Sequence, residues 1–244
     1  MRLALAALLL LISGGARAGE ALVAVATNFL TTAQTLAADF EAKTDHRITL
    51  ASGATGTLYA QIRRGAPFDL FLAADHDRPA QLAAEGLAEP PVIYATGTLT
   101  LWSADPDRIA GPDSLTETPP RRFAIANPDL APYGAAAQDA IAALGWSETL
   151  EGRIVRGENV GQAFAMIATG NAEVGLIATS ALHMPRTGPR GSHWPVPPGT
   201  HRPIQQAAVL TPRGAANPAA RAFLDHLTSP KAAALIAASG YLAP

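Results

Sequence analysis

Residues 21–30 read Ala-Leu-Val-Ala-Val-Ala-Thr-Asn-Phe-Leu. This segment indicates the architecture that we predict for the whole chain. The run from Ala21 to Ala26 is short and apolar, which is typical of a buried strand. After it, apolar side chains recur at helical spacing, at Leu30, Ala33, Leu36, Ala37 and Phe40. A buried strand that leads into an amphipathic helix predicts the first unit of a parallel α/β sheet.

The same alternation continues along the rest of the sequence. Apolar runs predict strands over 48–51, 68–73, 98–102, 123–126, 153–155, 174–178 and 206–211. Helical spacing predicts helices over about 57–64, 78–85, 134–144 and 160–169, and two more that open at Asn217-Pro218 and Ser229-Pro230. The Pro/Gly-rich stretch from His183 to Pro203 is predicted to be a loop.

Two successive α/β units predict two lobes, each with a mostly parallel sheet and helices on both faces. Lobe I is expected to contain residues 19–96 and 205–244, and lobe II residues 97–204. The chain then crosses between the lobes near Tyr94–Thr98 and near Pro203–Gln206. Two crossings form a hinge, and the space between the lobes is a natural ligand cleft. A single fused sheet is the alternative that the pattern leaves open.

The first 18 residues have the composition of a signal peptide. Arg2 precedes an apolar run from Leu3 to Ile12, and Ala16-Arg17-Ala18 is a small-x-small cleavage site. The run is shorter than the roughly 20 residues of a membrane-spanning helix, although a retained anchor is the alternative. The chain has no cysteine, which excludes a lipidated cysteine, disulfides and thiolate metal sites. We therefore expect a soluble periplasmic protein that is not anchored in the membrane and starts at Gly19.

The charge balance argues against a nucleic-acid partner. The chain has 18 basic and 20 acidic residues, and without Arg2 and Arg17 the balance is 16 to 20. Nucleic-acid binding usually needs a basic footprint, which a net charge of −4 does not provide. An anionic ligand would therefore be held by local dipoles.

Four strand-to-helix loops provide such dipoles, at residues 27–29, 52–57, 132–134 and 158–161. They lie at the carboxyl ends of predicted strands, where ligands bind in α/β folds, and each exposes the N–H groups of a helix start. Glu158 is the only charged residue in them, and Arg156 lies just outside. Six hydrogen bonds to an anion would supply roughly 9–18 kcal/mol gross, against about 8–12 kcal/mol for sub-micromolar binding. The alternative is ordinary helix capping by Thr27, Asn28, Ser52 and Thr55.

On these residues the chain resembles the periplasmic molybdate-binding proteins of ABC transporters, from about Leu22 to Leu242. The resemblance rests on the segments 25–29, 54–62, 65–75, 131–134 and 158–160, and above all on Gly65-Ala66-Pro67-Phe68-Asp69-Leu70-Phe71. It implies a two-lobe periplasmic-binding-protein fold and an oxyanion ligand, molybdate or tungstate, without protein ligands to the metal and without a cofactor. It also implies an inner-membrane ABC permease as partner. We expect a monomer.

The resemblance assigns the oxyanion ligands residue by residue. Thr27 and Asn28 would bind from the first loop, and Ala54 and Thr55 from the second. Tyr133 and Val160 would each offer a backbone N–H from lobe II. Ala54 replaces a serine of many relatives, and Ala178 replaces a tyrosine of some, so Asn28 is expected to be the replacement donor. Asp69 and Asp75 are expected to brace loops.

Other classes of function stay as alternatives. The sequence has no Gly-x-Ser-x-Gly, His-Glu-x-x-His or Gly-x-x-x-x-Gly-Lys-Ser/Thr motif, so we predict that it is not an enzyme, with a periplasmic hydrolase or metal enzyme as the rival. His183, His193 and His201 could bind zinc in the Pro/Gly-rich loop. The ligand could also be sulfate, thiosulfate or another small solute, and the protein could act in adhesion or sensing.

Overall fold

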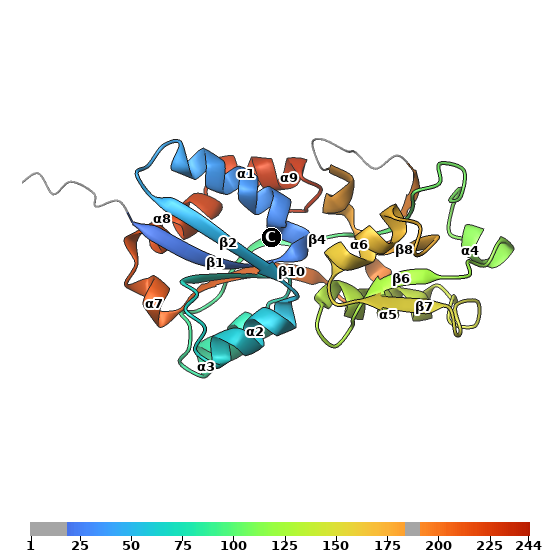
Figure 1. Cartoon of the computed structure of the whole chain (residues 1–244), viewed down its shortest axis with the longest axis horizontal. Coiled ribbons are helices and arrows are strands. Elements are labelled where there is room, and N and C mark those ends of the chain that lie inside the picture. The colour runs from blue at the N-terminus through green and yellow to red at the C-terminus, as the bar shows by residue number, and fades with distance from the viewer. Residues whose placement is uncertain (1–18, 184–190) are drawn as a thin grey trace, which may run out of the picture.

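The computed structural model describes residues 19–183 and 191–244, so the predicted signal peptide lies outside the described residues. Two five-stranded sheets lie side by side, each in its own lobe (Figure 1). The sheet of lobe I has the order β2-β1-β3-β10-β4 and contains β1 (Glu20–Ala26), β2 (Arg47–Gly53), β3 (Leu70–Ala73), β4 (Val92–Gly97) and β10 (Ile204–Leu210). The sheet of lobe II has the order β7-β6-β8-β5-β9 and contains β5 (Leu99–Ser103), β6 (Phe123–Ala126), β7 (Ile154–Gly157), β8 (Val174–Ala178) and β9 (Ser192–Pro195).

The predicted two-lobe α/β fold is confirmed, and both sheets are mixed: parallel and antiparallel pairs occur in each. In lobe I, β1 pairs with β2 and β3 in parallel, whereas β10 pairs with β3 and β4 antiparallel. In lobe II, β6 pairs in parallel with β7 and β8, whereas β5 pairs antiparallel with β8 and β9. The antiparallel strands adjoin the two connections between lobes. There the chain enters or leaves a lobe directly and makes no helical crossover, which parallel pairing requires.

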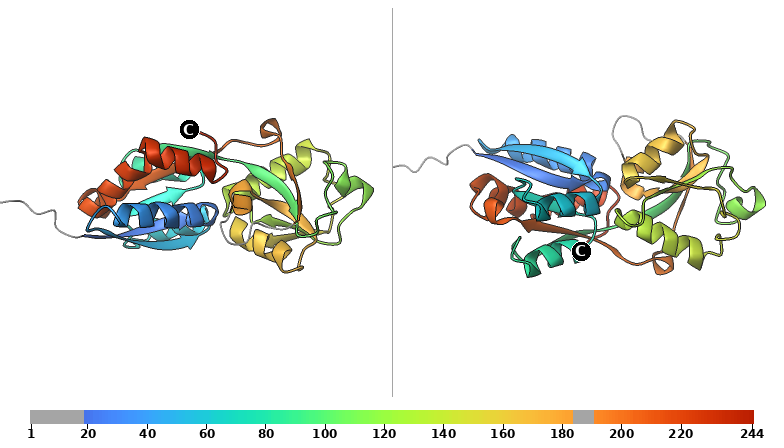
Figure 2. Two further views of the ribbon diagram at one scale, coloured as in Figure 1. Left: turned by 90° about the horizontal axis from the view of Figure 1, so that it is seen from above. Right: turned by 60° about the horizontal axis from the view of Figure 1, so that its bottom comes forward.

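Helices cover both faces of the first sheet. One face carries α1 (Leu30–Glu41), α8 (Pro218–Leu227) and α9 (Pro230–Ala238), and the other carries α2 (Thr55–Arg63) and α3 (Asp77–Ala84) (Figures 1 and 2). The side chains of β1 alternate between the two cores. Val23 and Val25 pack with Phe40 and Phe223 on the first face, and Ala24 packs on the second. The alternation follows from the two-residue period of a strand.

The second sheet is covered in the same way by α5 (Pro132–Ala143) and α6 (Val160–Ala168). Phe123 and Ile125 belong to the core that contains the residues of α5, and Ala124 belongs to the core of α6. The short α4 (Ser114–Glu117) lies near the far end of this lobe (Figure 1). Two helices start two residues earlier than predicted, at Thr55 and at Pro132. Proline suits the first position of a helix because its missing N–H would have no partner there.

Of the Pro/Gly-rich stretch predicted to be a loop, residues 184–190 lie outside the described residues, and the described part contains a strand and 3₁₀ turns. β9 pairs with β5 along Ser192–Pro195, and 3₁₀ turns cover Thr179–His183 (η2) and Pro198–Thr200 (η3). The remaining short helix, α7 (Pro212–Ala215), follows β10. Neither β9 nor β4 was predicted, because prolines beside both strands mask the apolar pattern, and such prolines are tolerated at sheet edges.

The chain passes between the lobes at two places, visible in Figure 2 as two adjacent connections. One runs from Gly97 at the end of β4 to Leu99 at the start of β5, and the other leads from η3 into β10 at Ile204. Gly97 and Ile204, which we predicted in lobe II, therefore lie in strands of lobe I. The C-terminal segment returns to this hinge, where Leu242 pairs with Thr96. Within the described ranges no helix is both long and apolar enough to span a bilayer.

Candidate functional site

Four helix starts meet where the lobes touch. The 3₁₀ turn η1 (Thr27–Phe29) follows β1, and α2 follows β2 after Ala54. From lobe II, α5 follows β6 after a short loop, and α6 follows β7. All four strands are parallel members of their sheets, so their carboxyl ends point toward the cleft, which is where ligands bind in such folds.

Direct contacts bring these loops together across the cleft. The backbone N–H of Gly56 on α2 donates to the carbonyl of Leu130, just before α5, at 2.8 Å. A Cβ built on Gly161 of α6 would lie 3.4 Å from Thr27 Cβ. Ser180 Oγ of lobe II donates to the carbonyl of Asn28 at 3.0 Å. The lobes are therefore closed over a small cavity of about 30 Å³, which is lined by Thr27, Asn28, Val160, Gly161, Phe164, Ala178, Ser180 and Ala181.

The expected anion donors share one property, which is an unused backbone N–H. Within residues 19–183 and 191–244, no acceptor is found for the N–H groups of Thr27, Asn28, Ala54, Thr55, Tyr133 and Val160. A helix start leaves such groups without a partner inside the helix, and a side chain normally satisfies at least one of them. Here η1, α2 and α5 have no side-chain cap, and only α6 has one, from Asn159 to the N–H of Gln162. Ordinary capping is therefore not what Thr27, Asn28 and Thr55 do.

The Thr55 and Thr27 hydroxyls have different surroundings. Thr55 Oγ1 accepts a hydrogen bond from the backbone N–H of Ala74 at 3.1 Å, and the residue is buried. Its hydroxyl therefore joins α2 to the end of β3, and its backbone N–H is the part left for a ligand. Thr27 Oγ1 has no hydrogen-bond partner within the described ranges, and Thr27 lines the cavity. It is the side-chain hydroxyl available to an anion.

The side chain of Asn28 does not behave as predicted. Asn28 Nδ2 donates to Gln206 Oε1 at 2.9 Å and to the Tyr241 hydroxyl at 3.1 Å, so both of its N–H bonds are used inside the protein. The Tyr241 hydroxyl in turn donates to the Asn28 carbonyl at 2.7 Å. The role of replacement side-chain donor was therefore wrong for Asn28. What it offers the cleft is its backbone N–H.

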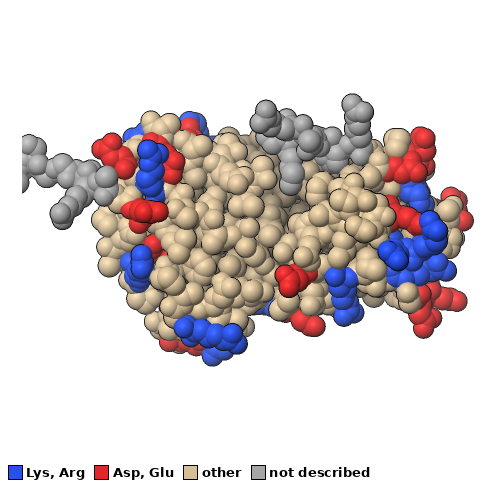
Figure 3. All heavy atoms as spheres, in the orientation of Figure 1, with Lys and Arg blue, Asp and Glu red and all other residues tan. Residues whose placement is uncertain are grey.

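Positive charge is scarce at the site. Arg156 is exposed on β7 and does not line the cavity. Arg78 is paired with Asp75 and donates from Nη2 to the carbonyl of Asp129 across the lobes at 3.1 Å. Burial raises the pKa of the Asp75 carboxyl, and Arg78 opposes this rise. On the face shown in Figure 3, charged side chains gather toward the two ends of the molecule, and few lie where the lobes meet. Among the described residues, those that line the cavity carry no charged side chain.

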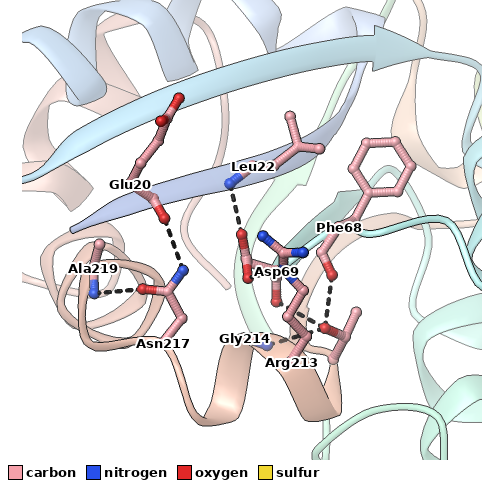
Figure 4. A network of polar contacts seen from close by, with 9 residues as sticks. Glu20, Leu22, Phe68, Asp69, Arg213, Gly214, Asn217 and Ala219 are labelled. Atoms are coloured by element: carbon pink, nitrogen blue, oxygen red, sulfur yellow. Dashed lines mark hydrogen bonds and ion pairs between the residues drawn. The ribbon is translucent and has the colours of Figure 1, made fainter.

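Asp69 and Asp75 brace the protein, as expected. Asp69 is fully buried, and its carboxylate accepts from the backbone N–H of Leu22 at 2.8 Å and from Arg213 Nε at 2.9 Å (Figure 4). Thr211 Oγ1 donates to the carbonyl of Phe68 and accepts from the N–H of Gly214. The Gly-Ala-Pro-Phe-Asp segment is thus tied to β1 and α7. Asp75 accepts from the N–H of Arg78 at the start of α3.

The histidines predicted as an alternative zinc site do not form one in the described structure. Within the ranges that the structure covers, no group of three His, Cys, Asp or Glu residues could hold a metal ion. His193 lies on β9, and His201 follows η3, where its ring contacts the carbonyl of Arg202.

Four residues of the site region were missed, namely Gly56, Ser180, Gln206 and Tyr241. Each acts through a contact more than 70 positions away along the chain. A contact of this kind leaves no periodic signal in a single sequence. Gly56 stood inside the second predicted loop but was not singled out.

Comparisons with known proteins agree with this geometry. Residues 21–242 match the family model of bacterial extracellular solute-binding proteins. The chain is 45% identical over 229 residues to the molybdate-binding protein ModA of Rhodobacter capsulatus, covering 93% of this chain and 90% of that protein. The solved structure of the periplasmic molybdate-binding protein of Azotobacter vinelandii superposes with a TM-score of 0.86 at 38% identity, over 92% of this chain and 99% of that one.

A more distant likeness concerns the fold alone. The sulfate-binding protein SubI of Mycobacterium tuberculosis has a TM-score of 0.76 at 16% identity, over 91% of this chain and 86% of that one. The two-lobe architecture thus occurs in proteins whose names record different tetrahedral anions. The similarity over nearly the whole chain identifies the family: this chain belongs to the bacterial extracellular solute-binding proteins and, among them, to the molybdate-binding ModA proteins.

Proposed function

We propose that this chain captures molybdate in the cleft between its lobes and delivers it to an inner-membrane ABC importer. The carrying observation is the set of six backbone N–H groups, from four helix starts in both lobes, for which the described residues supply no acceptor, together with a cavity whose described lining carries no charged side chain. Hydrogen bonds to a charged ligand contribute about 1.5–3 kcal/mol each, which is ample for tight binding after the cost of closure. Such a site suits an anion that stays fully ionised.

The residues of the site are proposed in the same terms. Thr27, Asn28, Ala54, Thr55, Tyr133 and Val160 bind through their backbone N–H groups, and Thr27 adds its hydroxyl. Because the donors come from both lobes, the anion holds the lobes together in the way that ligands close hinged proteins. We propose that two bodies move, residues 19–97 with 204–244 and residues 98–203; each boundary differs by one residue from the one predicted from the sequence, because Gly97 and Ile204 lie in strands of lobe I.

Tungstate is proposed as a second ligand because it has the charge and shape of molybdate. Sulfate has the same charge and geometry but shorter bonds, so donors spaced for molybdate cannot all reach its oxygens. We also propose export to the periplasm by the signal peptide, with Gly19 as the first mature residue, and a monomer without cofactor or catalytic activity. The uncharged lining of the cavity and the similarity to molybdate-binding proteins support the choice of ligands, and the similarity to a periplasmic protein supports the export.

The test is a panel of oxyanions on the ligand-free mature protein. Molybdate and tungstate should raise the melting temperature, since a ligand at about 1,000 times its Kd adds roughly 4 kcal/mol of stability. Sulfate, thiosulfate and phosphate should give much smaller shifts, and isothermal calorimetry should rank the affinities in the same order. Equal shifts with sulfate and molybdate would overturn the molybdate assignment. Delivery to an importer is tested by molybdate uptake in cells whose own binding-protein gene has been replaced by this one.

A further inference from the structure

Gln206 is a buried polar residue that the anion site itself does not explain. It lies on β10, beside the hinge, and is completely buried. Its Oε1 accepts the hydrogen bond from Asn28 Nδ2. Its Nε2 is buried and has no partner among the residues that the structure describes. A buried donor without an acceptor destabilises a protein, so an apolar side chain of similar size would serve the core better.

The surroundings of Gln206 join the hinge to both lobes. A Cβ built on Gly97, at the first crossing, would lie 2.9 Å from Gln206 Nε2 and 2.2 Å from the Tyr133 hydroxyl. Both groups therefore pack against the bare Cα of Gly97. The pairing of β10 with β4 shifts register between Gln206 and Ala207, and a bulge of this kind re-aims a side chain.

The residues next to Gln206 belong to the binding loops. Asn28 carries one of the unused N–H groups of lobe I, and Tyr133 carries one of lobe II. The Asn28 side chain also contacts the Tyr133 hydroxyl, whose pKa is raised chiefly by burial and lowered in part by this contact. The buried face of the first loop is therefore held by Gln206 and Tyr241, and its cleft face carries the free donors of Thr27 and Asn28.

We propose that Gln206 is a positioning residue for oxyanion binding, which holds the Asn28 side chain so that the backbone donors of the first loop face the cleft in the closed protein. The inference rests on the proposed function. It explains why a buried amide with an unpaired donor lies behind the site. The bond to Asn28 benefits ligand binding, whereas the unpaired Nε2 is a cost to the fold.

The test uses Gln206→Met, which removes the amide and keeps an unbranched side chain of similar length. Molybdate affinity should fall by about tenfold, the size expected for a lost hydrogen bond that orients a donor loop. The melting temperature of the ligand-free protein should stay the same or rise. Gln205→Met is the matched control, because Gln205 is the exposed neighbour on the same strand and should change neither quantity. A purely structural role of Gln206 would instead lower the stability and leave the affinity of the folded protein unchanged.

Two further variants separate positioning from other effects. In an Asn28→Ala background, Gln206→Met should have no additional effect on affinity, because residues that act through one another are not additive. Gln206→Glu places an ionisable group near the anion, so its molybdate affinity should fall as the pH rises, whereas Gln205→Glu should show a flat profile. If Gln206→Met does not fold, the pH dependence of Gln206→Glu still tests the positioning role.

The outcomes are distinguishable. Wild-type affinity in Gln206→Met, or an equal loss in the presence and absence of the Asn28 side chain, would overturn the positioning role and leave the proposed function intact. Failure of the wild-type protein to bind either molybdate or tungstate would overturn the proposed function and, with it, this inference.

Discussion

The helix starts at the cleft and those at the back of lobe I are built in opposite ways. At the back, Thr211, Asn217 and Ser229 each accept a hydrogen bond from the N–H of a residue in the first turn of α7, α8 and α9. At the cleft, η1, α2 and α5 have no such side-chain bond. Three helix starts at the back are thus capped by side chains, whereas three of the four at the cleft, where we propose that the anion binds, are not; the fourth, α6, is capped by Asn159. Substitutions at the back should change stability, and substitutions at the cleft should change affinity.

The largest effect is expected at the back, from Asp69→Ala. The substitution leaves the N–H of Leu22 without its acceptor and removes the partner of Arg213. Because Arg213 is largely exposed, the cost comes mainly from the Leu22 N–H that loses its acceptor, and it should be about 3 kcal/mol, the upper end of the usual cost of an unsatisfied buried group. Urea denaturation should show a loss of this size, with molybdate affinity unchanged in calorimetry under folding conditions. Arg213→Ala should lower the stability less, because the Arg213 side chain is largely exposed. A parallel loss of affinity in either variant would break the division between back and cleft.

At the cleft, Thr27→Val should weaken molybdate binding by about 1.5–3 kcal/mol, the usual contribution of a hydrogen bond to a charged group. Valine matches threonine in shape, so stability should not fall. Calorimetry and thermal melting measure the two quantities, and Thr27→Ser, which keeps the hydroxyl, should retain most of the affinity. If Thr27→Val loses stability and no affinity, the hydroxyl belongs to the fold.

Closure itself is tested by Gly56→Ala. The added Cβ would lie 3.0 Å from the carbonyl oxygen of Leu130 and 3.3 Å from Arg78 Nη2, so it should hold the closed lobes apart. Overpacking of this kind costs about 1–3 kcal/mol, which should appear as weaker molybdate binding and a larger radius of gyration in the presence of ligand. Gly111→Ala is the control, because a Cβ there meets nothing within 4 Å. Unchanged affinity in Gly56→Ala would mean that this contact is not needed for binding.

A smaller effect is expected from Ser229→Ala at the back. Ser229 Oγ accepts from the N–H of Ala232 at 3.2 Å, and the loss of a cap costs about 1 kcal/mol. The melting temperature should drop by a few degrees without any change in molybdate affinity. Asn159→Ala removes the one side-chain cap at the cleft and should change both quantities, since α6 supplies the donor of Val160.

The smallest effect concerns pH. His226 lies near Asp39, and its pKa is lowered mainly by burial, against the attraction of Asp39 and together with Lys43 and Lys231. The folded state therefore disfavours the charged ring. The stability that His226 supports is present above its unfolded pKa of about 6.5 and is lost as the pH falls below that value through the lower folded pKa. Melting between pH 8 and 5.5 should show a decline that His226→Gln reduces.

Molybdate affinity should stay nearly flat over the same pH range, because none of the described residues that line the cavity has a titrating side chain. Arg156→Ala should also leave it unchanged. A steep pH dependence, or a collapse of affinity in Arg156→Ala, would show that charge captures the ligand.

The sequence alone determined the alternation of strands and helices, the presence of two units and the loops that form the cleft. These features are local: an apolar run such as 21–26 and a helical pattern such as 30–40 lie within a short window. The loops that contain Tyr133 and Val160 followed from the same logic, because the loop after a parallel strand lies at one edge of the sheet. The individual donor residues came from the family resemblance, and they remain predictions.

Only the tertiary structure decided what the side chains do. Asn28 was predicted to face the ligand, and its amide instead turns inward to Gln206 and Tyr241, which lie 178 and 213 positions away. The antiparallel strands β4 and β10 were equally invisible as partners, because their pairing joins residues 92–97 to residues 204–208. Hydrogen bonds and packing between distant segments have no period in the sequence, so the direction of a polar side chain is settled when the chain has folded around it.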